Sequence, residues 1–272
     1  MTAAPTADEY WGREGLERAI LTALAAAGKD IDTLTVDDLA PTDQFHSGGK
    51  PATVRLARVA RLQPGVRVLD VGGGLGGPAR TLAAEFGCHV TVVDLTESYV
   101  RAGAALTARL GLAGRVTHRV GDALALEVGP DRFDVVWTQN SGMNIADKER
   151  LYAGFARALC PGGRLAIQEP MAGPAHPPIF PVMWAQDARS SFLRAPDAMR
   201  AVIEAAGFHV RAWDDVTADL AGPSTAAAVP AHSIQRIVMG AALDDILRAG
   251  QRNRDERRIL SVQAVFERRP SA

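Results

Sequence analysis

The chain has 272 residues, of which 47% are hydrophobic and 22% charged, and its formal net charge is −1. This composition indicates a globular protein with a sizeable core, and it lacks the strong basic balance typical of proteins that bind nucleic acid or anionic membranes. We therefore expect neither a nucleic-acid nor a membrane partner. Two cysteines, Cys88 and Cys160, are too few for a disulfide framework. With no leader-like pattern in the first residues, they predict a cytoplasmic protein.

The first 57 residues are predicted to form a helical cap. A helix is expected over residues 9–27, where apolar residues recur at helical spacing before Gly28. A turn-rich link follows, and then a polar, glycine-flanked loop over residues 43–49. A second helix is expected over residues 51–60. The first helix is also a candidate contact for a homo-oligomer.

Strands and helices alternate from residue 58 onward. Repeated strand–helix–strand units with continuous apolar strands predict a parallel sheet covered on both faces. The fold class is therefore α/β, a Rossmann-like doubly wound sheet, with residues 58–272 as one domain. Two insertions that break the alternation, 172–194 and 220–250, are expected to be lids over the ligand crevice. Strands are expected at 66–71, 90–95, 116–120, 133–138, 164–169, 208–216 and 259–267, and helices at 77–86, 97–110, 148–159 and 195–206.

A glycine-rich turn, residues 70–77, joins the first strand to the next helix and reads DVGGGLGG. Glycines let a backbone turn sharply and approach a ligand closely. The spacing of Gly72, Gly74 and Gly77 fits a dinucleotide, whereas Gly72, Gly74 and Gly76 fit the methyltransferase pattern. Taken alone, the turn therefore fits two cofactors, or a tight turn that binds nothing.

Residues at the ends of the later strands help to choose between these alternatives. Asp94 ends the second strand, where a carboxylate can accept both hydroxyl hydrogens of a ribose. Asp122 and Ala123 follow the third strand, where an acid next to a small residue suits the exocyclic amine of adenine. Asp134 opens the fourth strand, and a Pro-Gly-Gly turn at 161–163 precedes the fifth.

In this order, the motifs resemble those of class I S-adenosylmethionine-dependent methyltransferases. The chain is similar to their small-molecule branch, which includes sarcosine and dimethylglycine N-methyltransferases, ubiquinone-pathway C-methyltransferases and actinobacterial natural-product enzymes. The resemblance implies seven strands with the last antiparallel. The matching motifs are VLDVGGG (68–74), VDL (93–95), GDA (121–123), PGG (161–163) and DQFHSGG (43–49). The implied cofactor residues are Gln44, Asp70, Gly72, Gly73, Gly74, Asp94, Leu95, Asp122, Ala123 and Gln139.

Methyl transfer from a sulfonium is an in-line displacement that needs positioning and, for some acceptors, a base. Glu169, at the end of the fifth strand, is the first candidate for that base, because burial can raise its pKa. Equally, it can orient substrate or pair with an arginine. His46, in the loop expected over the cofactor, is the second candidate, with positioning favoured over catalysis. No metal ligands are expected.

The apolar lid predicts a small, hydrophobic acceptor, a natural product or isoprenoid, methylated on carbon. Its candidate contacts are Phe180, Met183, Trp184 and Phe192. The alternative is a small amine such as sarcosine or dimethylglycine, whose carboxylate would need Arg189 or Arg194. Mg²⁺ is expected only for a diphosphate acceptor, with charge from the arginines at 236, 248, 252 and 254. An NAD(P)-linked oxidoreductase and a non-catalytic binding module are the alternatives from other classes.

Overall fold

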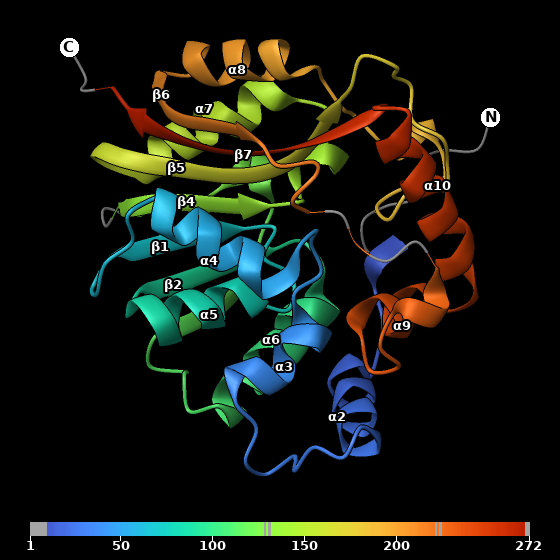
Figure 1. The fold of residues 1–272 in the computed structure, drawn as a ribbon. Helices are drawn as coiled ribbons and strands as arrows, with labels where there is room; N and C mark the ends of the chain where they lie inside the picture. Colours follow the sequence, from blue (N-terminus) through green and yellow to red (C-terminus); the bar gives the residue numbers. More distant parts are fainter. Residues whose placement is uncertain (1–9, 128, 130–131, 221, 223–224, 270–272) are drawn as a thin grey trace.

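The computed structural model describes residues 10–127, 129, 132–220, 222 and 225–269. Within them, seven strands form one mixed sheet in the order β3-β2-β1-β4-β5-β7-β6 (Figure 1). Strands β1 to β5 are parallel, and β7 is antiparallel to both β5 and β6. The predicted α/β class with an antiparallel last strand is confirmed. The strands are β1 (Arg67–Val71), β2 (His89–Asp94), β3 (Val116–Val120), β4 (Phe133–Gln139), β5 (Leu159–Ala172), β6 (Phe208–Asp215) and β7 (Ile259–Arg268).

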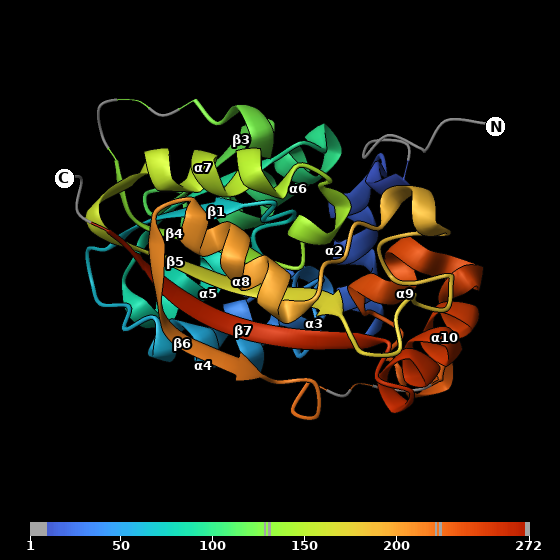
Figure 2. The ribbon, with the colours of Figure 1, turned by 90° about the horizontal axis from the view of Figure 1, so that it is seen from above.

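Helices cover both sides of the sheet (Figure 2) and pack their apolar residues against it. On one side, α4 (Gly49–Val59) and α5 (Gly77–Phe86) pack Leu56 and Leu82 against Val90 and Trp137. On the other side lie α7 (Lys148–Ala158) and α8 (Pro196–Ala205), whose apolar residues pack against β5 and β7. Helix α6 (Glu97–Arg109) contacts β2 and β3.

The amino-terminal part differs from its prediction. The expected helix over 9–27 begins regularly only at Leu16, because Gly15 adopts a left-handed conformation with φ 69°; α2 spans Leu16–Ala26, and residue 9 lies outside the described residues. The expected link around Pro41 is instead largely helical, as α3 (Val36–Asp43). Thr35 and Asp38 form a reciprocal capping box that starts this helix.

The two predicted lids have different structures. Residues 172–194 are mostly irregular, with a short 3₁₀ turn, η3 (Ala188–Ser190), and a bridge between Val182 and Ala185. The later insertion contains α9 (Ile234–Met239) and α10 (Leu243–Asp255). Both helices lie beyond the carboxyl ends of β4 and β5 (Figure 1). In the described part of the chain, no helix is long and apolar enough to cross a membrane.

Candidate active site

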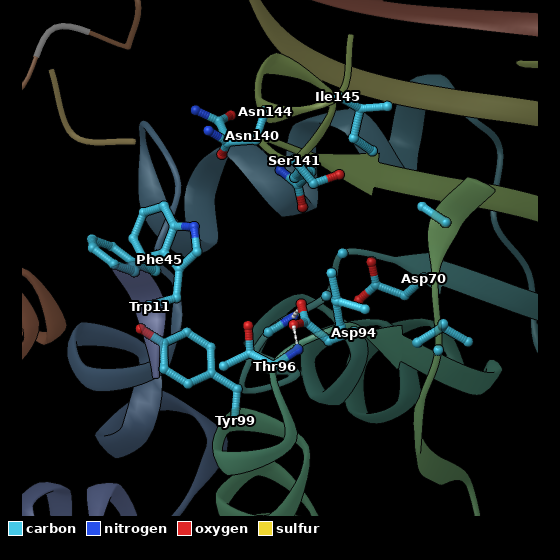
Figure 3. Close-up of a pocket in the computed structure, with 18 of the residues that line it drawn as sticks. Trp11, Phe45, Asp70, Asp94, Thr96, Tyr99, Asn140, Ser141, Asn144 and Ile145 are labelled. Atoms are coloured by element: carbon cyan, nitrogen blue, oxygen red, sulfur yellow. Dashed lines mark hydrogen bonds between the residues drawn. The ribbon is translucent and has the colours of Figure 1, made fainter. Parts of the chain in front are cut away.

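A cavity of about 560 Å³ opens where the parallel strands end. Its wall is formed by residues that follow β1, β2, β3 and β4, which is where open α/β sheets bind ligands. In Figure 3, Asn140, Ser141 and Asn144 lie across the cavity from Asp94 and Thr96. The structure therefore brings together polar side chains that are up to 50 residues apart in the sequence, from Asp94 to Asn144.

The glycine turn forms one wall of this cavity and leaves no room for side chains. Gly72 and Gly74 have positive φ values of 71° and 54°. A Cβ at Gly72 would lie 2.3 Å from the Ser141 Cβ, and one at Gly73 would lie 2.6 Å from the Asp70 Oδ2. Glycine is thus required both by conformation and by the close approach of the wall.

Asp94 fixes the turn against the end of β2. Its Oδ2 accepts the Gly74 N–H at 2.8 Å, and its Oδ1 accepts the Thr96 N–H at 2.9 Å. Leu95, the next residue, lines the same cavity and is 54% exposed. A carboxylate beside an exposed apolar surface can hold a ribose while a flat ring covers the leucine.

Asp70 is the most buried acid of the cavity. It is 1% exposed, and no described residue hydrogen-bonds its Oδ2. Burial, with a smaller effect from Asp94, raises the pKa of Asp70 to about 7. Tyr99 also lines the cavity with a hydroxyl that lacks a described partner. These unpartnered polar atoms suit a ligand with hydrogen-bonding groups of its own.

Three further predicted cofactor residues lie in the cavity wall. They are Asp122, Ala123 and Gln139. The Asp122 Oδ1 accepts the Leu124 N–H at 2.8 Å. Gln44 does not line the cavity: it is buried behind the wall, and its Nε2 donates to the Thr81 Oγ1 at 3.0 Å.

His46 belongs to a buried polar network. Its Nε2 lies 2.9 Å from the Gln44 Oε1 and 3.1 Å from the Thr53 Oγ1. The Thr53 hydroxyl donates to the Gln139 Oε1 at 3.0 Å. Burial lowers the pKa of His46 to about 4, so the ring is neutral at pH 7. The network holds the imidazole ring in one orientation, and burial keeps it uncharged at neutral pH.

A second cavity, of about 180 Å³, adjoins the first. Both cavities are lined by the same four residues: Trp11, Phe45, His46 and Asn140. Trp11 and Phe45 pack edge to face with their ring centroids 5.5 Å apart (Figure 3). Asn140 has a φ of 53°, which is uncommon for a residue other than glycine and recurs at functional sites. We call this set the junction.

The four predicted acceptor contacts separate in the structure. Met183 and Trp184 line the second cavity, and Phe192 lines the first. Phe180 lines neither and packs instead against the cluster around Trp184.

The two arginines expected to clamp a small amine point elsewhere. Arg194 pairs with Glu149 at 2.6 Å, and Arg189 pairs with Asp187 at 2.7 Å. Neither arginine lines either cavity.

Glu169, the first candidate base, lines neither cavity. It is 3% exposed, and its Oε1 accepts the backbone N–H of Gly142 at 3.0 Å and the hydroxyl of Thr138 at 3.3 Å. A Cβ at Gly142 would lie 3.1 Å from this oxygen, so the turn separates the carboxyl from the cavity. Burial raises the pKa of Glu169, as its place at the end of a buried strand predicts. Its carboxyl, however, contacts the backbone of the turn and not the cavity.

Tyr99 lines the cavity although no sequence pattern predicts it. The sequence offers Trp11 as a contact either for the acceptor or for a second subunit, Phe45 lies in the 43–49 motif, and Asn140 belongs to the polar run that follows the fourth strand. The structure places all three in the cavity wall. Within the described residues, no group of three His, Cys, Asp or Glu side chains is placed to hold a metal ion.

Comparison with known proteins assigns the central part of the chain to a known domain family. Residues 68–163 match the family described as a methyltransferase domain. The chain carries a methyltransferase domain. The matched region begins in β1 and includes the glycine turn, Asp94 and Asp122. The turn is therefore assigned to the methyltransferase pattern and not to the dinucleotide pattern.

The methyltransferase domain has curated relatives of several kinds. The chain is 33% identical to a glycine/sarcosine/dimethylglycine N-methyltransferase of Actinopolyspora halophila over 48% of the chain and 23% of that protein. It is 38% identical to a probable tocopherol O-methyltransferase of Oryza sativa over 37% and 28%. It is 32% identical to the methyltransferase GfsG of Streptomyces halstedii over 60% and 56%. The match thus spans less than two thirds of each relative's length.

Solved structures confirm the fold that the resemblance implies. The [4+2]-cyclase SpnF is similar over 100% of this chain and 99% of its own, with a TM-score of 0.70 and 20% identity. A geranyl diphosphate C-methyltransferase of Streptomyces coelicolor, solved with Mg²⁺ and S-adenosylhomocysteine, is similar over 98% and 100%, with a TM-score of 0.65 and 17% identity.

The cavity of the methyltransferase domain fits S-adenosylmethionine. The glycine turn admits a close backbone approach, Asp94 offers a carboxylate to a ribose, and the free Oδ2 of Asp70 offers an acceptor to an ammonium group. The exposed face of Leu95 suits adenine. The cofactor would thus meet an unpartnered oxygen on Asp70 and an exposed apolar face on Leu95.

Proposed function

We propose that this chain transfers the methyl group of S-adenosylmethionine to a small, largely apolar acceptor held in the second cavity. The observation that carries the proposal is the junction, where the cofactor cavity and the second cavity share Trp11, Phe45, His46 and Asn140. A donor in one cavity and an acceptor in the other would meet there.

The chain's contribution to the reaction is mainly positioning. S-adenosylmethionine supplies an activated methyl group, and the displacement needs no covalent enzyme intermediate. Holding the reacting atoms in line at near-attack distance is worth up to roughly 7–11 kcal/mol. The aromatic pair Trp11 and Phe45 offers apolar surface at the junction, and the buried network holds His46 in one orientation.

The apolar lining favours a natural product or isoprenoid as the acceptor. Met143, Val182, Trp184 and Ile246 are among the residues that line the second cavity. We propose methylation on carbon, with a small amine as the alternative. Curated relatives include N- and O-methyltransferases, so this choice rests on the cavity alone.

Cofactor binding tests the proposal directly. Calorimetry should show binding of S-adenosylmethionine and S-adenosylhomocysteine to the native chain. Asp94→Ala should weaken both at least tenfold, because it removes a charged acceptor, and hydrogen bonds to charged groups are worth about 1.5–3 kcal/mol. Asp94→Asn, which keeps one oxygen, should lose less.

The matched control is Asp245→Ala, which removes an exposed acid of α10 whose one ion pair within the described residues is with Arg248. It should leave cofactor affinity unchanged. Absence of binding at millimolar S-adenosylhomocysteine would refute the proposal. A fluorescence change with NADH would favour the oxidoreductase in its place.

A further inference from the structure

One charged side chain lines the second cavity, and it is a cation. Arg254 projects from α10 into a lining that is otherwise apolar or uncharged among the described residues. No aspartate or glutamate belongs to that described lining. Arg254 does not line the cofactor cavity, so it belongs to the acceptor side alone.

The partners of Arg254 leave most of its guanidinium available. One Nη2 hydrogen is donated to the Gln251 Oε1 at 2.7 Å, and Gln251 in turn donates from its Nε2 to the Asp255 Oδ1 at 2.7 Å. Within the described part of the chain, no carboxylate lies within the 4.0 Å of an ion pair with Arg254. A neutral amide therefore orients the arginine without neutralising it.

The neighbouring arginines show the contrast. Arg248 pairs with Asp245, and Arg252 pairs with Glu256 at 3.1 Å. Both side chains are about two-thirds exposed, at 67% and 64%. Arg254, half-buried on the same helix, is the one that faces the cavity.

A half-buried guanidinium without an ion-pair partner loses hydration, and the hydrogen bond to Gln251 and the nearby charge of Asp255 replace only part of it. Burial accordingly lowers the pKa of Arg254, although an arginine stays charged at neutral pH. A planar carboxylate matches the guanidinium with two parallel hydrogen bonds. An acidic ligand would restore the missing counter-charge.

We propose that the acceptor is an amphipathic acid, whose carboxylate binds Arg254 while its apolar body fills the second cavity and reaches the junction. This inference rests on the proposed function and adds the class of substrate. It makes Arg254 a specificity-determining residue that selects acids over neutral molecules of the same shape.

Paired probes test this inference without any methyl transfer. Octanoate and octanamide have the same size and apolar chain and differ in charge. By calorimetry at pH 7.5, the native chain should bind octanoate at least tenfold more tightly than octanamide. Arg254→Gln should abolish that preference, and Arg254→Lys should keep part of it. Arg252→Gln, on the same helix and exposed, should behave like the native chain.

Three results would overturn the inference. They are equal affinity of the native chain for the two probes, no octanoate binding at millimolar concentration, or an unchanged preference in Arg254→Gln. The comparison of probes on the native chain needs no variant to fold. S-adenosylhomocysteine binding, measured in parallel, reports separately on the proposed function, so either can fail while the other stands.

Discussion

At the scale of single residues, Asp70 contributes a buried carboxyl oxygen that lacks a hydrogen-bond partner among the described residues. Its carboxyl is buried at the end of β1, yet one oxygen has no described partner. A buried polar atom without a partner costs free energy in the protein alone. Asp70 lines the proposed cofactor cavity, so a hydrogen bond from the bound cofactor to this oxygen would offset the free-energy cost.

Asp70 should make stability depend on pH. Its pKa is about 7 in the folded chain and near 3.9 in an unfolded one, so between about pH 4 and 7 the folded state holds the extra proton. Stability should therefore fall as the pH rises through this window, by at most about 4 kcal/mol at 1.36 kcal/mol per unit. Asp70→Asn should reduce this slope, leaving the smaller contribution of other buried acids such as Glu169, and should unfold at a higher temperature than the native chain at pH 8.

Thermal unfolding from pH 5 to pH 8 measures this effect. Asp245→Asn, on the exposed face of α10, is the control and should keep the native slope. An Asp70→Asn chain whose slope equals the native one would show that another group titrates.

At the scale of elements, the turn from Asn140 to Ile145 is held from behind by two buried charged residues. Glu169 accepts the Gly142 N–H, and the Lys148 ammonium donates to the carbonyl oxygens of Gly142 and Ile145. The turn itself supplies Asn140 and Ser141 to the cofactor cavity. We propose that Glu169 positions this turn and does not act as the base.

Two substitutions separate the roles of Glu169. Glu169→Gln keeps the oxygen that accepts from Gly142, so a positioning residue should retain turnover within about threefold. Glu169→Ala leaves the Gly142 N–H unsatisfied and should cost about 1–3 kcal/mol of stability and weaken S-adenosylhomocysteine binding. If Glu169 is the base, Glu169→Gln should instead lower turnover at least tenfold with unchanged cofactor affinity. Turnover, calorimetry and urea unfolding on the two variants decide.

At the scale of the molecule, a buried ion pair joins the amino-terminal helices to the sheet. Arg80 of α5 donates to the Asp43 Oδ2 at 2.8 Å, and both side chains are at most 1% exposed. The Arg80 Nη1 also donates to the Thr107 hydroxyl of α6 at 2.9 Å. The division at residue 57 stays a prediction, but α3, α5 and α6 meet at this point. Homo-oligomer contact through the first helix also stays a prediction.

Breaking this pair should destabilise the chain strongly. Arg80→Gln leaves Asp43 buried without a counter-charge, which typically costs about 3–5 kcal/mol. Arg101→Gln removes an exposed pair with Glu14 and should cost less than about 1 kcal/mol. Urea unfolding of the two variants measures the contrast, and equal losses would show that Asp43 is not held as an ion pair.

Local pattern predicted the alternating elements well and the amino-terminal region poorly. Helix α5 matches its predicted bounds, because Gly76 and Gly87 limit it on both sides. Helix α3 was not predicted, because Pro41 and several acidic residues disguise its helical pattern. Its formation depends on a capping box and on packing against α5. Strand β5 extends beyond the predicted 164–169 because pairing with β7 continues to Ala172.

The sequence by itself determined the order of strands and helices and the cofactor side of the site. Those features depend on neighbours along the chain: a strand, its glycine turn and the acid that ends the next strand. On the acceptor side the sequence indicated Met183 and Trp184, and only the tertiary structure placed Trp11 and Arg254 in the same cavity wall. No local pattern tells which of four nearby arginines faces a cavity. Packing decides that, because a side chain's exposure and counter-charge depend on residues far away in the sequence.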